Sequence, residues 1–206
     1  MPLYKEITHS NNRVLIWKIS ETEKELSMDF SNDFIISINK NFKLSKRRIE
    51  KLTLANLLRL AEINHSQLQY TPSGKPYILS SQKNMSFSHS GEFASLLIST
   101  SQCGIDIQKD NSKIQNISSK FLNDEEKLFL NKPDALNWIW SIKEAVFKYF
   151  GQNVIFKEDM IVCKLDLNTF TAQVNYKGVH GLGIFDLKLE KIENYYLAFT
   201  IGYNHL

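Results

Sequence analysis

An aspartate and a glutamate, each in an otherwise apolar segment, are the residues of this sequence best suited to metal and proton chemistry. Asp106 lies in the segment 104–108, whose alternation predicts a strand with two isoleucines on one face and Asp106 on the other. Aspartate is uncommon in strands, so this face either contacts solvent or has a function. Spacing alone leaves the two readings equally open.

Glu144 and Lys148 lie four residues apart in a second segment, 135–150, which is apolar nearly all round and should form a buried helix. A polar stripe follows one face of this helix: Asn137, Ser141, Glu144 and Lys148. An ordinary ion pair would contribute about 0.2–0.5 kcal/mol, but it would not explain a carboxylate in so apolar a helix. A buried carboxylate needs a partner, and a metal ion is a stronger one than a flexible ammonium, so both readings stay open. Lys143 points about 100° away, which predicts a separate role.

The third candidate for a functional site is the cation-rich start of a predicted helix, which could bind an anion. Residues 45–63 have helical periodicity, with Ser45 as the expected N-cap. Lys46, Arg47 and Arg48 follow in the first turn, where cations oppose the helix dipole. A bound anion would compensate for them, and three solvated surface charges are the equal alternative.

His89 lies in Ser-Phe-Ser-His-Ser-Gly, residues 86–91, which we interpret as a turn of small residues. A lone histidine in such a turn is more often a structural residue than a catalyst. No serine has GxSxG around it, and the chain has no GxxxxGK[ST] and no HExxH. Serine hydrolase, P-loop and zinc-protease chemistry are therefore disfavoured.

Composition narrows the class of protein further. The chain has 206 residues, of which 43% are hydrophobic and 23% charged, and this suffices for a core without disulfides. A net charge of +3 is too small to indicate a nucleic-acid binder. No run of 18 apolar residues occurs, and the first 20 residues lack the apolar stretch of a signal peptide. Cys103 and Cys163 offer no CxxC spacing, so we expect free thiols in the cytoplasm.

The order of the predicted elements is mixed, with antiparallel hairpins late in the chain, which predicts an α+β fold. Expected helices cover residues 21–39, 45–63 and 135–150. Expected strands cover residues 14–19, 93–99, 104–108, 161–166, 170–176, 183–190 and 195–203. The segment Asn123–Glu126 resembles a capping box, and the polar stretch 109–118 is the best candidate for a linker.

Five short motifs occur in one order along the chain: GKPY at 74–77, SFSHSG at 86–91, GIDIQ at 104–108, FLNDEE at 121–126 and WSIKEAVFKYFG at 140–151. Together they resemble the 4'-phosphopantetheinyl transferase superfamily, and the length and spacing are similar to the Sfp type. The resemblance implies a pseudodimer of two similar α+β halves, residues 1–102 and 103–206, with coenzyme A and Mg2+ between them. It implies transfer of the 4'-phosphopantetheine arm of coenzyme A to a serine of an acyl or peptidyl carrier protein, releasing 3',5'-ADP. A monomer would suffice for such a site.

The resemblance also implies roles for individual residues. The metal ligands would be Asp106, Gln108 and Glu144. Glu144 would also be the general base, and Lys148 would contact the phosphates. The remaining coenzyme A contacts would come from Arg47 or Arg48 at the 3'-phosphate, Gly74, Lys75 and Pro76 at the adenine end, and Ser88 and His89 at a phosphate.

One departure from the family pattern is Gln108, where a glutamate is usual. The site then has one formal negative charge fewer, and we expect weaker Mg2+ binding rather than an inactive enzyme. Two other functions stay open: a coenzyme A-binding module without turnover, and a metal-dependent phosphohydrolase that cuts the diphosphate with water.

Overall fold

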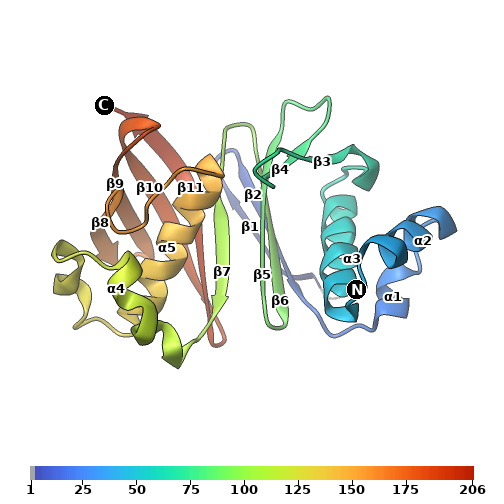
Figure 1. Cartoon of the computed structure of the whole chain (residues 1–206), viewed down its shortest axis with the longest axis horizontal. Coiled ribbons are helices and arrows are strands. Elements are labelled where there is room, and N and C mark those ends of the chain that lie inside the picture. The colour runs from blue at the N-terminus through green and yellow to red at the C-terminus, as the bar shows by residue number, and fades with distance from the viewer. Residues whose placement is uncertain (1–2) are drawn as a thin grey trace.

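Two antiparallel sheets, each packed against one long helix, make up most of this fold (Figure 1). The computed structural model describes residues 3–206. The mixture of helices and antiparallel strands confirms the α+β prediction. No helix in the described range is long and apolar enough to cross a membrane.

The first sheet has the strand order β1-β2-β6-β5. Its strands are β1 (Leu3–His9), β2 (Asn12–Lys18), β5 (Asn84–Ser90) and β6 (Phe93–Ser99). Three helices precede its last two strands: α1 (Glu23–Ser27), α2 (Asn32–Asn41) and α3 (Ser45–Leu60). A short 3-10 turn, η1 (His65–Gln67), leads into a two-stranded hairpin of β3 (Leu68–Tyr70) and β4 (Pro76–Ile78).

The second sheet has the strand order β7-β11-β10-β9-β8. Its strands are β7 (Ile105–Lys109), β8 (Met160–Asp166), β9 (Thr171–Gly178), β10 (Gly181–Ile192) and β11 (Tyr195–His205). Between β7 and β8 the chain forms η2 (Ser112–Ile117), α4 (Ser118–Phe121), η3 (Glu125–Phe129) and α5 (Ala135–Phe150).

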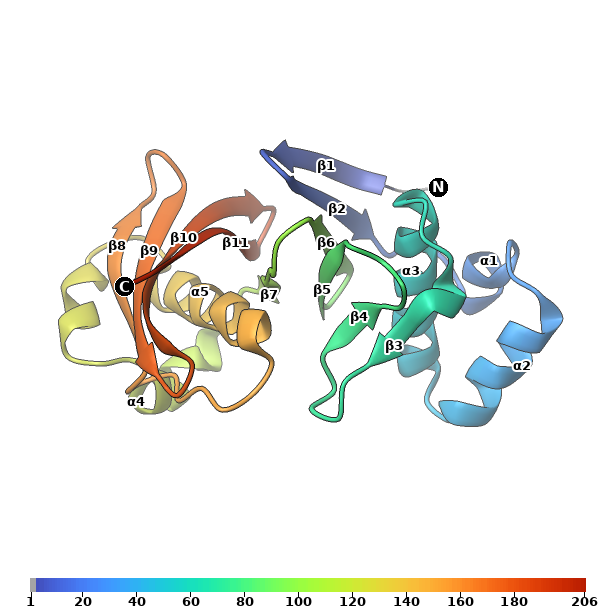
Figure 2. The same cartoon turned by 90° about the horizontal axis from the view of Figure 1, so that it is seen from above.

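Periodic apolar residues hold α3 and α5 on their sheets. Leu54, Leu57, Leu58 and Ala61, which carry the predicted repeat, are all buried against the first sheet. The apolar faces of α5 are buried against the second sheet in the same way. A third cluster joins strands of both sheets. Strands β5, β6 and β7 lie between α3 and α5 in both views (Figure 1, Figure 2).

Several local predictions were wrong. Residues 84–90 form a strand rather than a turn, so His89 lies on β5. The helix expected over residues 21–39 is instead two helices, α1 and α2, with a break between Ser27 and Asn32. Residues 109–118 are no linker, since Ile114 of η2 is buried in the second core.

The ends of the helices correct two more predictions. Leu44, not Ser45, is the N-cap of α3, and it has no side chain that could accept a hydrogen bond. The predicted end of α5 is confirmed, since Gly151 is its C-cap with φ of 85°, a conformation that favours glycine. The expected division at residue 102 falls between β6 and β7, and it stays a prediction; residues 1 and 2 of its first half lie outside the described range.

Candidate functional site

Asp106 lies where the edges of the two sheets meet, and it is 5% exposed. Its Oδ1 atom accepts a hydrogen bond from Ser88 Oγ at 2.8 Å and lies 2.7 Å from Lys148 Nζ. Its Oδ2 atom is buried with no hydrogen-bond partner. A buried carboxylate oxygen without a donor is costly, so this atom is suited to a ligand that brings positive charge.

Glu144 of α5 lies close enough to Asp106 for the two carboxylates to interact electrostatically. Burial raises the pKa of Glu144 to about 7, and the nearby charge of Asp106 adds to this while Lys148 opposes it. Lys148 forms its ion pair with Asp106 and not with Glu144, so the ordinary i,i+4 pair is absent among the described residues. The structure therefore brings Asp106, Glu144 and Lys148 together from a strand and a helix.

Gly104 lets β7 come this close to α5. A Cβ atom at Gly104 would lie 2.0 Å from the carbonyl oxygen of Ala145 and 2.7 Å from the backbone nitrogen of Tyr149. Backbone atoms cannot move aside as a flexible side chain can, so only glycine fits. Since Asp106 follows two residues later, this close approach sets its position relative to Glu144 and Lys148.

Alternate serines of β5 join the two sheet edges. Ser86 Oγ accepts a hydrogen bond from the Ile105 backbone N–H at 3.1 Å, and Ser90 Oγ accepts one from Lys109 at 3.0 Å. Ser88, between them, contacts Asp106 and Lys148 instead. The hydroxyl that the resemblance assigns to a phosphate is thus engaged with two other residues of the site.

His89 faces α3 from the same strand. Its Nε2 atom lies 2.7 Å from Glu50 Oε1, and the other oxygen of Glu50 accepts a hydrogen bond from Arg47 at 2.9 Å. Burial lowers the pKa of His89 more than the nearby Glu50 carboxylate raises it. Sequence reasoning missed Glu50; its place one helical turn after Arg47 was the available signal.

Arg48 points elsewhere. Its Nε atom lies 2.6 Å from Glu23 Oε1, and it donates hydrogen bonds to the carbonyl oxygens of Phe42 and Lys43. These contacts hold α1 and the start of α3 together. Of the two predicted arginines, Arg47 is therefore the one that the structure places beside His89.

The loop of Gly74, Lys75 and Pro76 reaches the C-terminal end of α5. Lys75 Nζ donates a hydrogen bond to the carbonyl oxygen of Tyr149, which also accepts one from Gln102 at 2.6 Å. A cation at this end of a helix is favourable. Burial lowers the pKa of Lys75. Lys75 and Pro76 also line a cavity of about 370 Å³ together with Tyr77, Gln102 and Cys103.

Gln108 lies on the same face of β7 as Asp106, but its amide donates a hydrogen bond to the carbonyl oxygen of Lys109 at 3.0 Å. In residues 3–206, no group of three or more His, Cys, Asp or Glu side chains could hold a metal ion. The acidic part of the site thus consists of Asp106 and Glu144.

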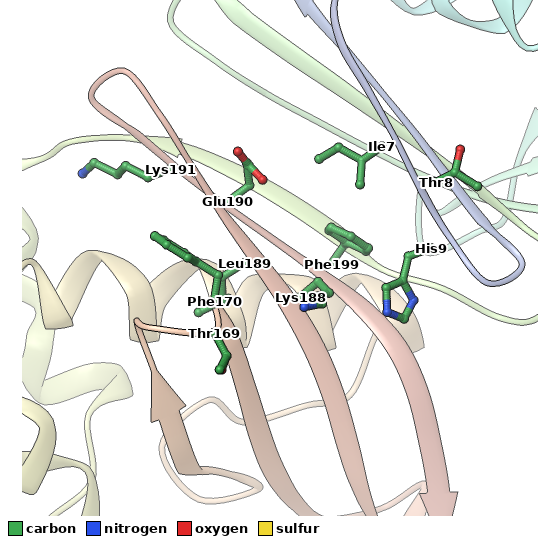
Figure 3. Close-up of a pocket in the computed structure, with 10 residues that line it drawn as sticks. All are labelled: Ile7, Thr8, His9, Thr169, Phe170, Lys188, Leu189, Glu190, Lys191 and Phe199. Atoms are coloured by element: carbon green, nitrogen blue, oxygen red, sulfur yellow. The ribbon is translucent and has the colours of Figure 1, made fainter.

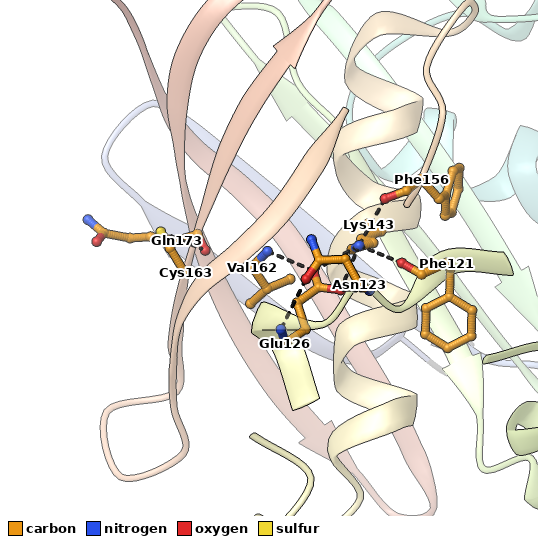
Figure 4. Close-up of polar contacts among 8 residues, drawn as sticks. All are labelled: Phe121, Asn123, Glu126, Lys143, Phe156, Val162, Cys163 and Gln173. Carbon is orange, nitrogen blue, oxygen red and sulfur yellow. Dashed lines mark hydrogen bonds and ion pairs between the residues drawn. The ribbon is translucent and has the colours of Figure 1, made fainter. Parts of the chain in front are cut away.

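Lys143 is fully buried and has the separate role that its direction predicted (Figure 4). Its Nζ atom donates to Glu126 Oε2 at 2.8 Å and to the carbonyl oxygens of Phe121 and Phe156. Glu126 accepts from the backbone of Asn123, whose side chain accepts from the Glu126 backbone in return. The reciprocal hydrogen bonds of the predicted capping box are therefore present, and Lys143 joins α5 to this segment one residue before Glu144.

A separate cavity of about 360 Å³ lies between β1 and β10 (Figure 3). Ile7 and His9 line one side, and Lys188 and Glu190 line the other. None of the predicted site residues contributes to it.

An acidic pair and a lysine at the junction of two sheets thus define the candidate site of this α+β protein. Residues 102–199 match the family model described as the 4'-phosphopantetheinyl transferase superfamily. A protein of Haemophilus influenzae named "Putative 4'-phosphopantetheinyl transferase" is 31% identical over 124 residues. That alignment covers 53% of this chain and 52% of the relative, so the match spans about half the length of each.

The matched segment contains Asp106, Gln108, Glu144 and Lys148. The resemblance to the superfamily is therefore borne out for the second half of the chain. The Sfp type, the roles of individual residues and the first half stay predictions.

Proposed function

We propose that this protein is a 4'-phosphopantetheinyl transferase of the Sfp type, which moves the arm of coenzyme A to a serine of an acyl or peptidyl carrier protein. The observation that carries the proposal is the orphaned, buried Oδ2 atom of Asp106 beside Glu144, with Lys148 bound to the same aspartate. The family match over residues 102–199 supports it. We further propose that the two sheets with their helices are the halves of a pseudodimer within one monomeric, cytoplasmic chain.

The residues present fit Mg2+. This ion prefers oxygen ligands and is usually held by one or two carboxylates, with water and substrate phosphates completing its shell. Asp106 and Glu144 supply two carboxylates, and Gln108 could add a carbonyl oxygen if its side chain turned from Lys109. When bound, the cation would offset the charge of the diphosphate and of the leaving group.

The side chains of the site can carry the transfer itself. Glu144 accepts the proton of the carrier serine, whose oxygen attacks the phosphorus that bears the pantetheine arm. The bond from that phosphorus to the oxygen of 3',5'-ADP breaks, and the electron pair leaves with that oxygen. Lys148 stabilises the charge on the phosphoryl oxygens in the transition state. In the metal-free protein burial raises the pKa of Glu144 to about 7, and a cation bound at this carboxylate would lower the pKa and keep the base ionised at neutral pH.

Coenzyme A would be held at its other end by the first half of the chain. Arg47 and His89 supply cationic donors for the 3'-phosphate. A guanidinium has five N–H donors and Arg47 donates one of them to Glu50, so other N–H groups can bind the phosphate. The loop of Gly74, Lys75 and Pro76, with its adjoining cavity, lies at the adenine end.

Mass spectrometry of a carrier protein tests this function. The purified chain is incubated with coenzyme A, Mg2+ and a panel of apo carriers. Transfer adds the phosphopantetheine arm to a carrier, and Glu144→Gln abolishes it, whereas Glu6→Gln, which alters an exposed ion pair, does not. Free phosphopantetheine without carrier modification would instead indicate the hydrolase, and binding without any product would indicate the module that lacks turnover.

A further inference from the structure

Glu50 is a buried carboxylate shared between two cationic groups of the first half. It lies on α3 with 7% of its surface exposed. One of its oxygens lies 2.7 Å from His89 Nε2 on β5, and the other accepts from Arg47 at 2.9 Å. No motif of the sequence included it, and the reaction described above does not use it.

The contact with Glu50 decides what the other ring nitrogen of His89 can do. With Nε2 only 2.7 Å from a carboxylate oxygen, a neutral ring keeps its hydrogen on Nε2, so Nδ1 carries a lone pair and can only accept. The oxygens of a phosphate dianion also only accept, so the two would repel. In the imidazolium form both nitrogens donate, and Nδ1 can bind a phosphate while Nε2 stays on Glu50.

We propose that Glu50 is a positioning residue, which orients His89 and holds it as an imidazolium when a phosphate monoester binds beside Arg47. This inference rests on the proposed function, in which that monoester is the 3'-phosphate of coenzyme A. Glu50 is then the residue through which the protein distinguishes coenzyme A from its 3'-dephospho form.

Three charged groups act on the His89 ring: Glu50 and Arg47 from α3, and Lys148 from α5. Burial and the two cations lower the pKa of His89, and Glu50 raises it. The free ring is therefore largely neutral at neutral pH. A phosphate dianion adds a second favourable charge, so its binding takes up a proton, and affinity falls as the pH rises.

Calorimetric titration with coenzyme A and with 3'-dephospho-coenzyme A tests the proposal. Each is measured at about pH 7 and about pH 8, where the phosphate monoester is mostly a dianion, in buffers of different ionisation enthalpy, so that proton uptake by the protein is obtained directly. We expect wild-type protein to bind coenzyme A more tightly and to take up a proton as it does so. Glu50→Gln should lower the affinity for coenzyme A about tenfold, the effect of one lost charged hydrogen bond, and leave the affinity for the dephospho form unchanged.

Two further variants and one ligand-free measurement complete the test. Glu50→Asp keeps the charge and should restore part of the preference, and Glu6→Gln should behave as wild type. NMR titration of His89 without ligand should show a lower pKa in Glu50→Gln. Unchanged binding of the dephospho form shows that the variant is folded.

The outcomes separate the inference from the proposed function. If wild type prefers coenzyme A and Glu50→Gln keeps both that preference and the proton uptake, the inference is wrong while the function stands. If wild type binds neither nucleotide, the proposed function is wrong, and the role of Glu50 in phosphate selection fails with it.

Discussion

Lys148 Nζ and Asp106 Oδ1 lie 2.7 Å apart, although 42 residues separate them in the chain. The lysine is partly exposed and the aspartate nearly buried, with side-chain exposures of 27% and 7%. Because Lys148 forms its ion pair with Oδ1, the Oδ2 atom of Asp106 and the neighbouring Glu144 carboxylate can still bind a cation. One oxygen of Asp106 thus binds a lysine of the protein, and the other is oriented for a ligand.

Ser88→Ala should impair this arrangement. Ser88 Oγ donates to Asp106 and accepts from Lys148, so its loss removes hydrogen bonds to two charged groups. We expect carrier modification to slow about tenfold, with Mg2+ dependence shifted to higher concentration. The matched control is Ser90→Ala on the same strand face, which removes a contact to the Lys109 backbone only. Equal rates for the two variants would contradict the role of Ser88.

Glu144→Gln should stabilise the metal-free protein at high pH. The folded-state pKa of Glu144, about 7, exceeds its ordinary value of 4.5, so the folded state binds more protons between these values. Stability from this group is present below about pH 4.5 and is lost as the pH rises toward 7. At about pH 8 we expect the variant to be more stable by roughly 1–2 kcal/mol, or about 2–8 °C in Tm.

Thermal unfolding at about pH 5 and about pH 8 measures this difference, which should be largest at the higher pH. Mg2+ should raise the Tm of wild type and not that of the variant. If the variant is less stable than wild type at the higher pH, burial of the ionised Glu144 carboxylate does not destabilise the folded state.

Lys143→Met should destabilise the fold strongly, because it leaves the Glu126 carboxylate buried without its cation. We expect a loss of about 3–5 kcal/mol in the free energy of unfolding, measured by urea denaturation. The double variant Glu126→Gln with Lys143→Met should recover part of this loss, since no buried charge remains. A single variant within about 1 kcal/mol of wild type would refute the structural role of the pair.

Gly104→Ala tests the close approach of β7 and α5. Its Cβ would meet backbone atoms of α5, so we expect a loss of about 3 kcal/mol or more in stability and loss of carrier modification. Gly202→Ala is the matched control, because the nearest atom to its Cβ would be Asp186 Oδ2 at 3.6 Å. If Gly104→Ala unfolds like this control, the packing that positions Asp106 is not as described.

Local sequence patterns predicted the elements that carry the site, and tertiary contacts decided the rest. The alternation around Asp106 and the polar stripe with Glu144 were sufficient to predict a strand and a helix. The strand that holds His89 was missed because its serines are weak strand formers, although their spacing of two was visible.

Partners from distant segments could not be predicted in this way. Neither the contact of Lys75 with the end of α5 nor that of Glu50 with His89 follows from spacing, since each joins two elements that meet only in the folded chain.

Binding of Mn2+, a paramagnetic substitute for Mg2+, tests the central claim most directly. Electron paramagnetic resonance in the presence of coenzyme A should show one bound ion per wild-type chain. Asp106→Asn and Glu144→Gln should each lose that ion, while Glu6→Gln keeps it. Full Mn2+ binding by both site variants would show that the strand acid and the helix acid do not share a cation, and the transferase account would fail with it.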